Sequence, residues 1–473
     1  MYGMKIIFHG GARSVTGANY LLEHNGIKIL VDCGLNQGSK YAEDLNYQPF
    51  KYDPAEIKYV FITHSHIDHI GRLPKLYKDG FRGKVYTTTA TRDMMAVALP
   101  DNMRRIGEEA KEMGHEPLFK QEDLDGLMLL VEGVNYNELI ELEGIVAVFH
   151  DAGHILGSAI VEIRWDINFK SLPTTNYKLQ TIRKVYFSGD LGNMPTPLLR
   201  PTDKITDADY IVIESAYGDR VHEGREERRQ KLVSIIKSTV ERGGVLMIPS
   251  FAVERTQELL YELNGLFNDK IIPRVPVFVD SPLAIKMTGV YKKHPEYFNK
   301  ETMYLIESGD DIFNFPGLQM TPTADESKKI NDVPAPKIII AGSGMSQGGR
   351  ILHHEIRYLP DSASTILFVG YQVDGSLGRR IQGGDKEVRI MGQIVPVRCN
   401  IENLSAYSAH ADQPGLLKWV GASTTDEGGA GSLKKVFVVQ GEEESAKTLA
   451  NLIREKYGID AVAPRESEEF KLG

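Results

Sequence analysis

The stretch that decides the fold is Lys58-Tyr-Val-Phe-Ile-Thr-His-Ser-His-Ile-Asp-His-Ile-Gly-Arg-Leu-Pro74. Its apolar part, residues 59–63, predicts a buried strand. Four potential metal ligands follow directly: His64, His66, Asp68 and His69. If the strand geometry persists, the first two side chains point the same way, whereas the last two turn elsewhere as a helix begins near Gly71. The cluster therefore predicts two metal ions rather than one.

Composition narrows the class of protein. The chain has 473 residues, of which 42% are hydrophobic and 25% charged, as in an ordinary globular protein of several domains. Its apolar runs, such as Ile338 to Ala341, are strand-sized, and no hydrophobic leader is visible. With only two cysteines, these features predict a cytoplasmic protein that does not bind a membrane. A net charge of −9 argues against coating nucleic acid by bulk charge, but permits an enzyme that handles it in one groove.

Further acidic side chains stand where predicted strands end. Asp32 follows the apolar run 27–31, Asp190 follows the strand at 185–188, and Glu214 ends the strand at 210–214. Asp32 alone is equally well read as a turn residue before Gly34. Together with His64, these residues share the carboxyl ends of successive strands, which is the edge where sites form in open α/β sheets. His154 lies in a glycine-flanked loop between two strands.

A second domain begins near residue 208. From there predicted strands alternate with helices, as in the strand 210–214, the helix 225–242 and the strand 245–249. This alternation indicates an α/β fold with a parallel sheet, which ends near residue 385.

The motifs together resemble those of the metallo-β-lactamase superfamily: His-x-His-x-Asp-His, the later Gly-His154, the strand end Ser-Gly-Asp190 and the strand end at Asp32. By that resemblance, one zinc ion would be held by His64, His66 and His154, and the second by Asp68, His69 and His410. Asp190 would bridge the two ions, and Asp32 would lie behind the ligands and orient them.

Later segments are similar to the β-CASP nucleases, which include the pre-mRNA cleavage and polyadenylation endonuclease: Glu214-Ser-Ala-Tyr-Gly-Asp219, Ile248-Pro-Ser-Phe-Ala-Val-Glu-Arg-Thr-Gln-Glu258, Asp280-Ser-Pro-Leu-Ala284, Gly342-Ser-Gly-Met-Ser-Gln-Gly-Gly-Arg350 and Ser408-Ala-His410. This likeness implies a four-layer αββα metallo-β-lactamase domain formed by residues 1–207 and 386–473. A parallel-sheet α/β β-CASP domain, residues 208–385, would be inserted into it, with the active site in the cleft between the two.

The function implied by this resemblance is that of a zinc-dependent ribonuclease with two zinc ions per chain. It would hydrolyse phosphodiester bonds of single-stranded RNA through a hydroxide that bridges the metals. Two alternatives stay open, a β-CASP nuclease acting on DNA and a catalytically weak RNA-binding scaffold. A homodimer also stays open.

The glycine-rich segment 342–350 precedes a predicted helix, so its backbone N–H groups and Arg350 are expected to hold a substrate phosphate. A plain turn is the alternative reading. Substrate binding is assigned to Ser343, Gly344, Ser346, Arg350, His353 and His354.

Two departures from the family pattern affect the chemistry. In the family, a histidine of the second domain pairs with an acidic residue and serves as general acid, but Arg380 stands at the corresponding position here. Arginine donates a proton poorly, although it stabilises developing charge, and His353 and His354 are candidates to help. The second departure is Gln440, where relatives often have histidine. Catalytic roles are assigned to Asp68, Asp190, Glu214 and Arg380.

Overall fold

The computed structural model describes residues 3–38, 40–167, 181–222, 225–370, 372–373, 375–404, 408–425, 429 and 431–473. The chain forms two compact units. Unit 1 comprises residues 1–196, 200–221 and 410–473, and unit 2 comprises residues 197–199 and 222–409. Among the described residues, no helix is both long enough and apolar enough to cross a membrane.

Unit 1 contains two seven-stranded sheets. The first has the order β22 (Glu469–Leu472), β1 (Met4–Gly10), β2 (Asn19–His24), β3 (Ile27–Val31), β4 (Ile57–Phe61), β5 (Lys84–Thr88) and β6 (Val131–Val134). The second has the order β21 (Asp460–Val462), β20 (Lys435–Val438), β11 (Tyr210–Ile213), β10 (Ile182–Phe187), β9 (Ala159–Asp166), β8 (Ile145–Asp151) and β7 (Ile140–Leu142).

The helices of unit 1 cover the outer faces of these sheets. They are α1 (Lys40–Asp44), α2 (Ile67–Ile70), α3 (Leu73–Lys78), α4 (Thr89–Met113), α5 (Gln121–Met128), α13 (Gln413–Gly421) and α14 (Glu443–Tyr457). Leu76 and Leu127, from α3 and α5, pack with Val60 on the first sheet. Trp419 and Ile453, from α13 and α14, belong to the core cluster on the second sheet.

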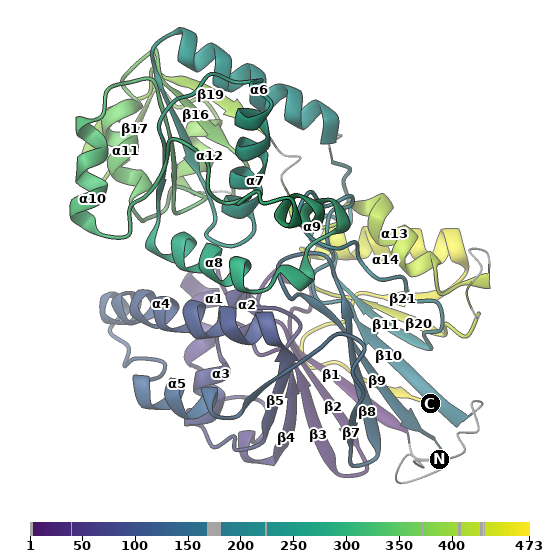
Figure 1. Cartoon of the computed structure of the whole chain (residues 1–473). Coiled ribbons are helices and arrows are strands. Elements are labelled where there is room, and N and C mark those ends of the chain that lie inside the picture. Colours follow the sequence, from purple (N-terminus) through teal and green to yellow (C-terminus); the bar gives the residue numbers. More distant parts are fainter. Residues whose placement is uncertain are drawn as a thin grey trace. The chain divides into compact units, whose positions relative to one another are not determined.

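The central core of unit 1 lies between the two sheets. Phe8 and Phe61 of the first sheet share one buried cluster with Phe149, Phe187 and Phe437 of the second. Helices therefore lie outside both sheets, as Figure 1 shows for α3 and α5 on one side and α13 and α14 on the other. This arrangement confirms the predicted four-layer αββα architecture.

Unit 2 is built on a six-stranded sheet in which every pairing is parallel. Its order is β14 (Leu318–Met320), β13 (Val277–Asp280), β15 (Lys337–Ala341), β12 (Val245–Pro249), β16 (Thr365–Phe368) and β19 (Asn400–Asn403). A hairpin pairs β17 (Glu387–Ile390) with β18 (Gln393–Pro396). The helices are α6 (Arg225–Glu241), α7 (Arg255–Asn268), α8 (Pro282–Lys293), α9 (Lys300–Glu307), α10 (Ala324–Lys329), α11 (Ile351–Tyr358) and α12 (Leu377–Gln382). Strand β12 is buried throughout, as expected for a parallel sheet covered on both faces.

The unit boundaries differ from the predicted ones at 207/208 and 385/386. Strand β11 was expected to open the inserted domain, but it pairs in parallel with β10 and β20 in the second sheet of unit 1. At the other end, β19 pairs with β16 and thus extends the sheet of unit 2 beyond residue 385. Apart from residues 197–199, which belong to unit 2, the chain therefore passes between the units at 221/222 and 409/410.

Candidate metal centre

The residues of the candidate site lie just beyond the carboxyl ends of parallel strands in unit 1. Asp32 follows β3, the histidine cluster follows β4, Asp190 follows β10, and Glu214 follows β11 directly. Because β3 and β4 are parallel, as are β10 and β11, these ends share the same edges of the two sheets. The predicted strand-end location is thus the one that the structure has.

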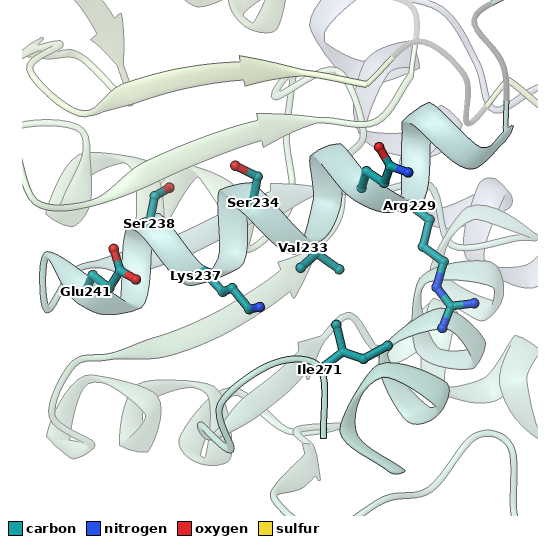
Figure 2. A pocket seen from close by; sticks show the side chains of 8 residues that line it. Arg229, Val233, Ser234, Lys237, Ser238, Glu241 and Ile271 are labelled. Carbon is teal, nitrogen blue, oxygen red and sulfur yellow. The ribbon is translucent and has the colours of Figure 1, made fainter. Parts of the chain in front are cut away.

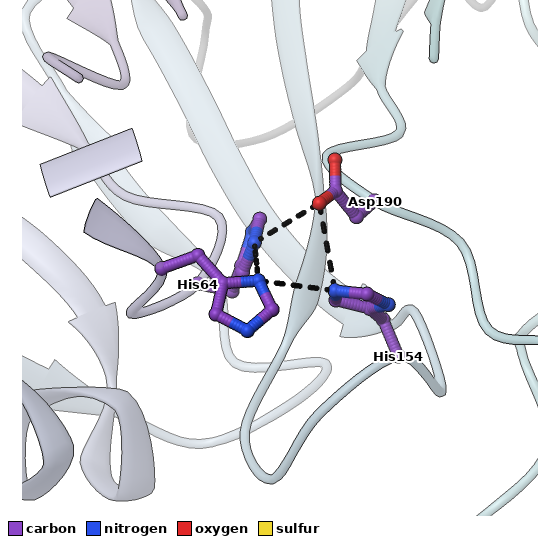
Figure 3. Close-up of side chains that lie close together, drawn as sticks. His64, His154 and Asp190 are labelled. Carbon is purple, nitrogen blue, oxygen red and sulfur yellow. Dashed lines mark hydrogen bonds and ion pairs between the residues drawn. The ribbon is translucent and has the colours of Figure 1, made fainter. Parts of the chain in front are cut away.

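Four of the predicted ligands form one compact group: His64, His66, His154 and Asp190. His64 Nε2 lies 3.1 Å from His66 Nδ1, and His154 Nε2 lies 3.2 Å from that same atom. Asp190 Oδ2 lies 3.3 Å from His64 Nε2 and 3.4 Å from His154 Nε2, the contacts that Figure 3 draws. Three nitrogens and one carboxylate oxygen therefore converge on one point.

This spacing fits a zinc ion. Tetrahedral zinc has bonds of about 2.0–2.1 Å to nitrogen and oxygen, which places its ligand atoms roughly 3.3–3.4 Å apart. The four measured separations, 3.1 to 3.4 Å, match that value closely. Burial is the main cause that lowers the pKa of both His66 and His154 well below 6.5. These imidazoles are therefore neutral, as a metal ligand must be.

A second position lies around His69. Its Nε2 is 3.4 Å from Asp190 Oδ1 and 3.7 Å from Asp68 Oδ2. Asp190 thus directs one carboxylate oxygen to the first group and the other to His69, which is the arrangement expected of a bridging ligand. The side-chain nitrogen of Gln440, Nε2, also lies 3.0 Å from His69 Nε2.

Asp32 lies behind this position and is fully buried. Its Oδ2 lies 2.8 Å from His69 Nδ1, and its two oxygens accept hydrogen bonds from the Thr63 backbone N–H and hydroxyl, both at 2.8 Å. The carboxylate therefore fixes the His69 ring so that Nε2 faces Asp190. This is the orienting contact that a metal-ligating histidine normally has.

His410 contacts Glu214 and Asp190. Its Nδ1 is 3.1 Å from Glu214 Oε2 and 3.8 Å from Asp190 Oδ2. Glu214 is fully buried, and its other oxygen accepts the Leu191 N–H at 2.6 Å. Asp190, Glu214 and His410 thus form a second group with ligand atoms within 4.8 Å of one another. A buried carboxylate needs partners, and the Leu191 N–H and His410 supply one for each oxygen of Glu214.

The electrostatics of the group follow from burial and from its mixed charges. Burial would raise the pKa of Asp190, but His69, His64 and His410 outweigh it and hold that pKa well below 3.8. Burial likewise opposes protonation of His410, yet Glu214 and Asp190 raise its pKa to about 9. His410 is therefore a cation at neutral pH, held between two carboxylates.

Arg350 and His354, which were predicted to bind substrate, both contact the buried carboxylate of Asp280. Arg350 Nη1 donates to Asp280 Oδ1 at 2.8 Å and to the Thr321 carbonyl at 2.6 Å. His354 Nε2 lies 2.7 Å from Asp280 Oδ2, which also accepts the Ser327 hydroxyl at 2.7 Å. Asp280 is fully buried at the end of β13, and the Arg350 guanidinium neutralises its charge. The contacts of Arg350 and His354 hold the segment 342–350 in place.

The remaining predicted substrate residues lie in or near that segment. The Ser346 hydroxyl donates to Glu355 Oε1 at 2.5 Å, and both residues are buried. Ser343 is partly exposed and its hydroxyl oxygen accepts the Gln347 N–H, while His353 is exposed on α11. The Gly344 carbonyl accepts a hydrogen bond from Gln372. Ser343 and His353 are thus the members of this set whose side chains reach the surface.

Arg380 is half-exposed on α12, where its guanidinium pairs with Asp385 at 2.9 Å. The structure therefore gives Glu214 a histidine partner, His410, and leaves Arg380 in a local ion pair.

A surface hollow of unit 2 runs along α6, with Arg229, Lys237 and Ile271 among its lining residues (Figure 2). None of its lining residues is a predicted site residue.

Sequence reasoning missed three supporting residues. Thr63 ends the predicted strand and reads there as a β-former, although its hydroxyl and N–H hold Asp32. Asp280 was quoted only as part of a motif, and Glu355 not at all. Local sequence gives no signal for either acid, because only their partners, 70 and 9 positions away, reveal their roles.

Family models match three segments of the chain. A metallo-beta-lactamase superfamily domain matches residues 21–177, and a Beta-Casp domain matches residues 256–381. A Zn-dependent metallo-hydrolase RNA specificity domain matches residues 394–464.

Relatives match over nearly the whole chain. Ribonuclease TTHA0252 of Thermus thermophilus is 36% identical over 455 residues, which are 95% of this chain and 96% of that protein. Transcription termination factor FttA of Methanosarcina mazei is 30% identical, over 98% of this chain and 71% of that protein. An RNase J-like protein of Methanocaldococcus jannaschii is 29% identical, over 97% of each.

A solved structure shares the fold. The crystal structure of a protein of unknown function from Enterococcus faecalis V583 has a TM-score of 0.55 and 12% identity, over 99% of this chain and 100% of that one. The order of the matched domains and the extent of the ribonuclease match agree with the four-layer fold and the histidine cluster. The chain belongs to the β-CASP branch of the metallo-β-lactamase superfamily.

Proposed function

We propose that this chain is a zinc-dependent ribonuclease that hydrolyses phosphodiester bonds of single-stranded RNA. The observation that carries the proposal is the convergence of His64, His66, His154 and Asp190 at the spacing of a zinc site. Two comparisons support RNA as the substrate. The chain matches a ribonuclease over 96% of that protein's length, and it matches an RNA specificity domain. The homodimer and the cytoplasmic location stay predictions.

The metal centre would have two positions that share Asp190. Its Oδ2 faces the first group and its Oδ1 faces His69, with Asp68 beside it. Zinc bound there would act as a Lewis acid and stabilise negative charge that develops on the phosphoryl oxygens. Asp32 holds the ring of His69 for this purpose through its 2.8 Å contact with Nδ1.

Proton transfer would fall to His410. The Glu214 carboxylate, 3.1 Å from His410 Nδ1, keeps the ring in one orientation and stabilises its protonated form. The side chain is 28% exposed, so it is accessible to a substrate. We assign His410 the donation of a proton to the leaving oxygen and Glu214 the support of that proton, a role for which the sequence had offered His353 and His354 as candidates.

RNA would be bound in part by unit 2. Arg350 and His354 are committed to Asp280 and act by positioning the loop 342–350. Direct contact with a phosphate is assigned instead to the Ser343 hydroxyl, to the backbone at Gly344 and to the exposed His353. Ser346 supports the loop through Glu355.

The test uses end-labelled RNA and single-stranded DNA of the same sequence. The parent should cleave RNA in a metal-dependent manner, and Asp190→Asn should not. Asp269→Asn replaces an exposed carboxylate of unit 2 and serves as the matched control, with activity unchanged. Absence of metal-dependent cleavage by the parent would overturn the enzyme proposal. Equal cleavage of the RNA and the single-stranded DNA would contradict the preference for RNA. Binding of RNA without cleavage would favour the scaffold alternative.

A further inference from the structure

Gln440 is the least expected residue at the second metal position. It lies just after β20, is only 4% exposed, and adopts a positive φ of 49° that few non-glycine residues adopt. Its backbone N–H donates to the Gly11 carbonyl at 2.7 Å. The positive φ and this hydrogen bond fix the backbone so that the side-chain amide points toward His69. Gln440 Nε2 lies 3.0 Å from His69 Nε2.

The contact has a consequence for His69 as a ligand. Asp32 binds the Nδ1 side of the ring at 2.8 Å, so in the neutral imidazole the hydrogen is on Nδ1 and the lone pair is on Nε2. That lone pair is the one a cation at the second position would need. The amide N–H₂ of Gln440 donates into it and therefore competes with the cation.

The other end of the amide has no such contact. Gln440 Oε1 is buried and has no hydrogen-bond partner among the described residues, and the same holds for the hydroxyl of Tyr20. Both oxygens lie against Gly11, where a methyl group on Cα would overlap each of them. A half-turn of the amide would place its N–H₂ toward Tyr20 and its oxygen toward His69. Since the two ends of an amide are nearly the same size, the site permits both orientations.

The two metal positions therefore differ in their donor atoms. The first has three imidazole nitrogens and one carboxylate oxygen, a set that suits zinc. The second has one imidazole, on His69, the carboxylate oxygens of Asp68 and Asp190, and the amide oxygen that Gln440 can present. Oxygen-rich sets suit Mn²⁺ and Mg²⁺, and a neutral amide binds zinc less strongly than imidazole does.

We infer that the chain holds one zinc ion tightly at the first position, and that Gln440 makes the second position a weak site for a harder divalent cation. The inference rests on the metal centre of the proposed function and specifies it. Gln440 thereby sets which metal completes the centre.

The experiment measures bound metal rather than activity. Parent, Gln440→His and Gln440→Ala proteins are dialysed against a zinc buffer, and metal is counted by mass spectrometry. We expect about one tightly bound zinc in the parent and in Gln440→Ala, and about two in Gln440→His. The second zinc of the parent should bind at least roughly 100-fold more weakly than the first. Zinc-loaded parent should bind one further Mn²⁺, detected by electron paramagnetic resonance.

The outcomes separate the two proposals. Two equally tight zinc ions in the parent would overturn the inference and leave the proposed function standing, whereas no bound zinc at all would overturn both. Gln440→His holding only one zinc would also overturn the inference. If circular dichroism shows that Gln440→His is unfolded, Gln440→Glu takes its place. The added carboxylate should strengthen Mn²⁺ binding at least roughly tenfold, which is the usual effect of one additional ligand. Unchanged Mn²⁺ binding would contradict the inference.

Discussion

Asp190 and Asp280 are both buried carboxylates at the carboxyl ends of strands, and both lie beside histidine, yet their surroundings differ. Asp280 accepts hydrogen bonds from Arg350, Ser327 and Thr321 and contacts His354, so each of its oxygens has protein donors. Asp190 instead faces imidazole nitrogens that also face one another. The first arrangement is complete within the protein, whereas the second would be completed by the proposed cation.

A metal centre and a structural cluster can be told apart by how hydrogen-bond donors and acceptors are arranged. In a structural cluster, donors and acceptors alternate, as where the Arg350 guanidinium meets Asp280 and the Thr321 carbonyl. In a metal centre, acceptors face acceptors, as where His66 Nδ1 lies 3.1 Å and 3.2 Å from two other ring nitrogens. Removing one residue should therefore affect ligand binding in one case and folding in the other.

The largest expected effect is that of Asp190→Asn. Because Asp190 would contribute an oxygen to each of the two proposed metal positions, its loss should lower RNA cleavage by about 1,000-fold or more. Zinc content should fall as well, while the urea midpoint of the metal-free protein stays close to that of the parent. A variant that retained full zinc and activity would contradict the assignment of Asp190 as a bridging ligand.

Asp280→Asn should give the opposite pattern. The change leaves Arg350 without its buried counter-charge, which should lower the free energy of unfolding by roughly 3–5 kcal/mol. Zinc content should not change, because Asp280 contacts no ligand of the metal centre among the described residues. Urea denaturation combined with metal analysis checks both statements, and Asp269→Asn is again the surface control. Loss of zinc with unchanged stability would show that Asp280 contributes to metal binding and not to folding, which contradicts the assignment.

Glu355 is a third buried carboxylate, and it sharpens the comparison through pH. It has one hydrogen bond, from Ser346, and its Oε2 has no partner among the described residues, so burial raises its pKa from 4.5 to about 8. Between these values the folded state retains a proton that the unfolded state loses. Its contribution is therefore fully present below about pH 4.5 and declines as the pH rises toward 8, by about 3 kcal/mol at pH 7.

Glu355→Gln removes that decline, since glutamine does not ionise. Relative to the parent, the variant should gain stability steadily from pH 4.5 to pH 8, as measured by urea denaturation at several pH values. Parallel curves for the two proteins would contradict the raised pKa. Ser346→Ala is the companion variant, because it removes the partner without removing the acid.

The smallest of the expected effects is that of Glu214→Gln. This change keeps the shape of the residue but weakens its hold on the proton of His410, and cleavage should fall by about 100-fold. Zinc content should be unchanged, and the pH at which activity declines on the alkaline side should move down. A loss of zinc equal to that of Asp190→Asn would instead make Glu214 a metal ligand.

Much of the fold was predictable from the sequence, because local patterns carry it. The apolar strand 245–249 was placed to the residue, and the alternation of strands and helices gave the parallel sheet of unit 2. The assignment of β11 was not predictable in the same way. An apolar four-residue strand looks alike in either sheet, and only its pairing with β20, from a segment more than 200 positions later, places it in unit 1.

The candidate site shows the same limit at the level of side chains. Spacing along the chain singled out His64, His66 and Asp190, because they follow strands that end at common edges. It could not show that Arg350 is held by Asp280 or that His410 lies against Glu214, since these partners are 70 and 196 positions apart. Local sequence shows which residues are suited to bind a metal, whereas tertiary structure decides which side chains contact one another.

Anomalous X-ray diffraction at the zinc edge, on crystals of zinc-loaded protein, would locate the bound zinc. We expect a strong peak between His64 Nε2, His66 Nδ1, His154 Nε2 and Asp190 Oδ2, and none within the cluster around Asp280. A peak beside Asp280, or none at the histidine cluster, would contradict the proposed zinc site.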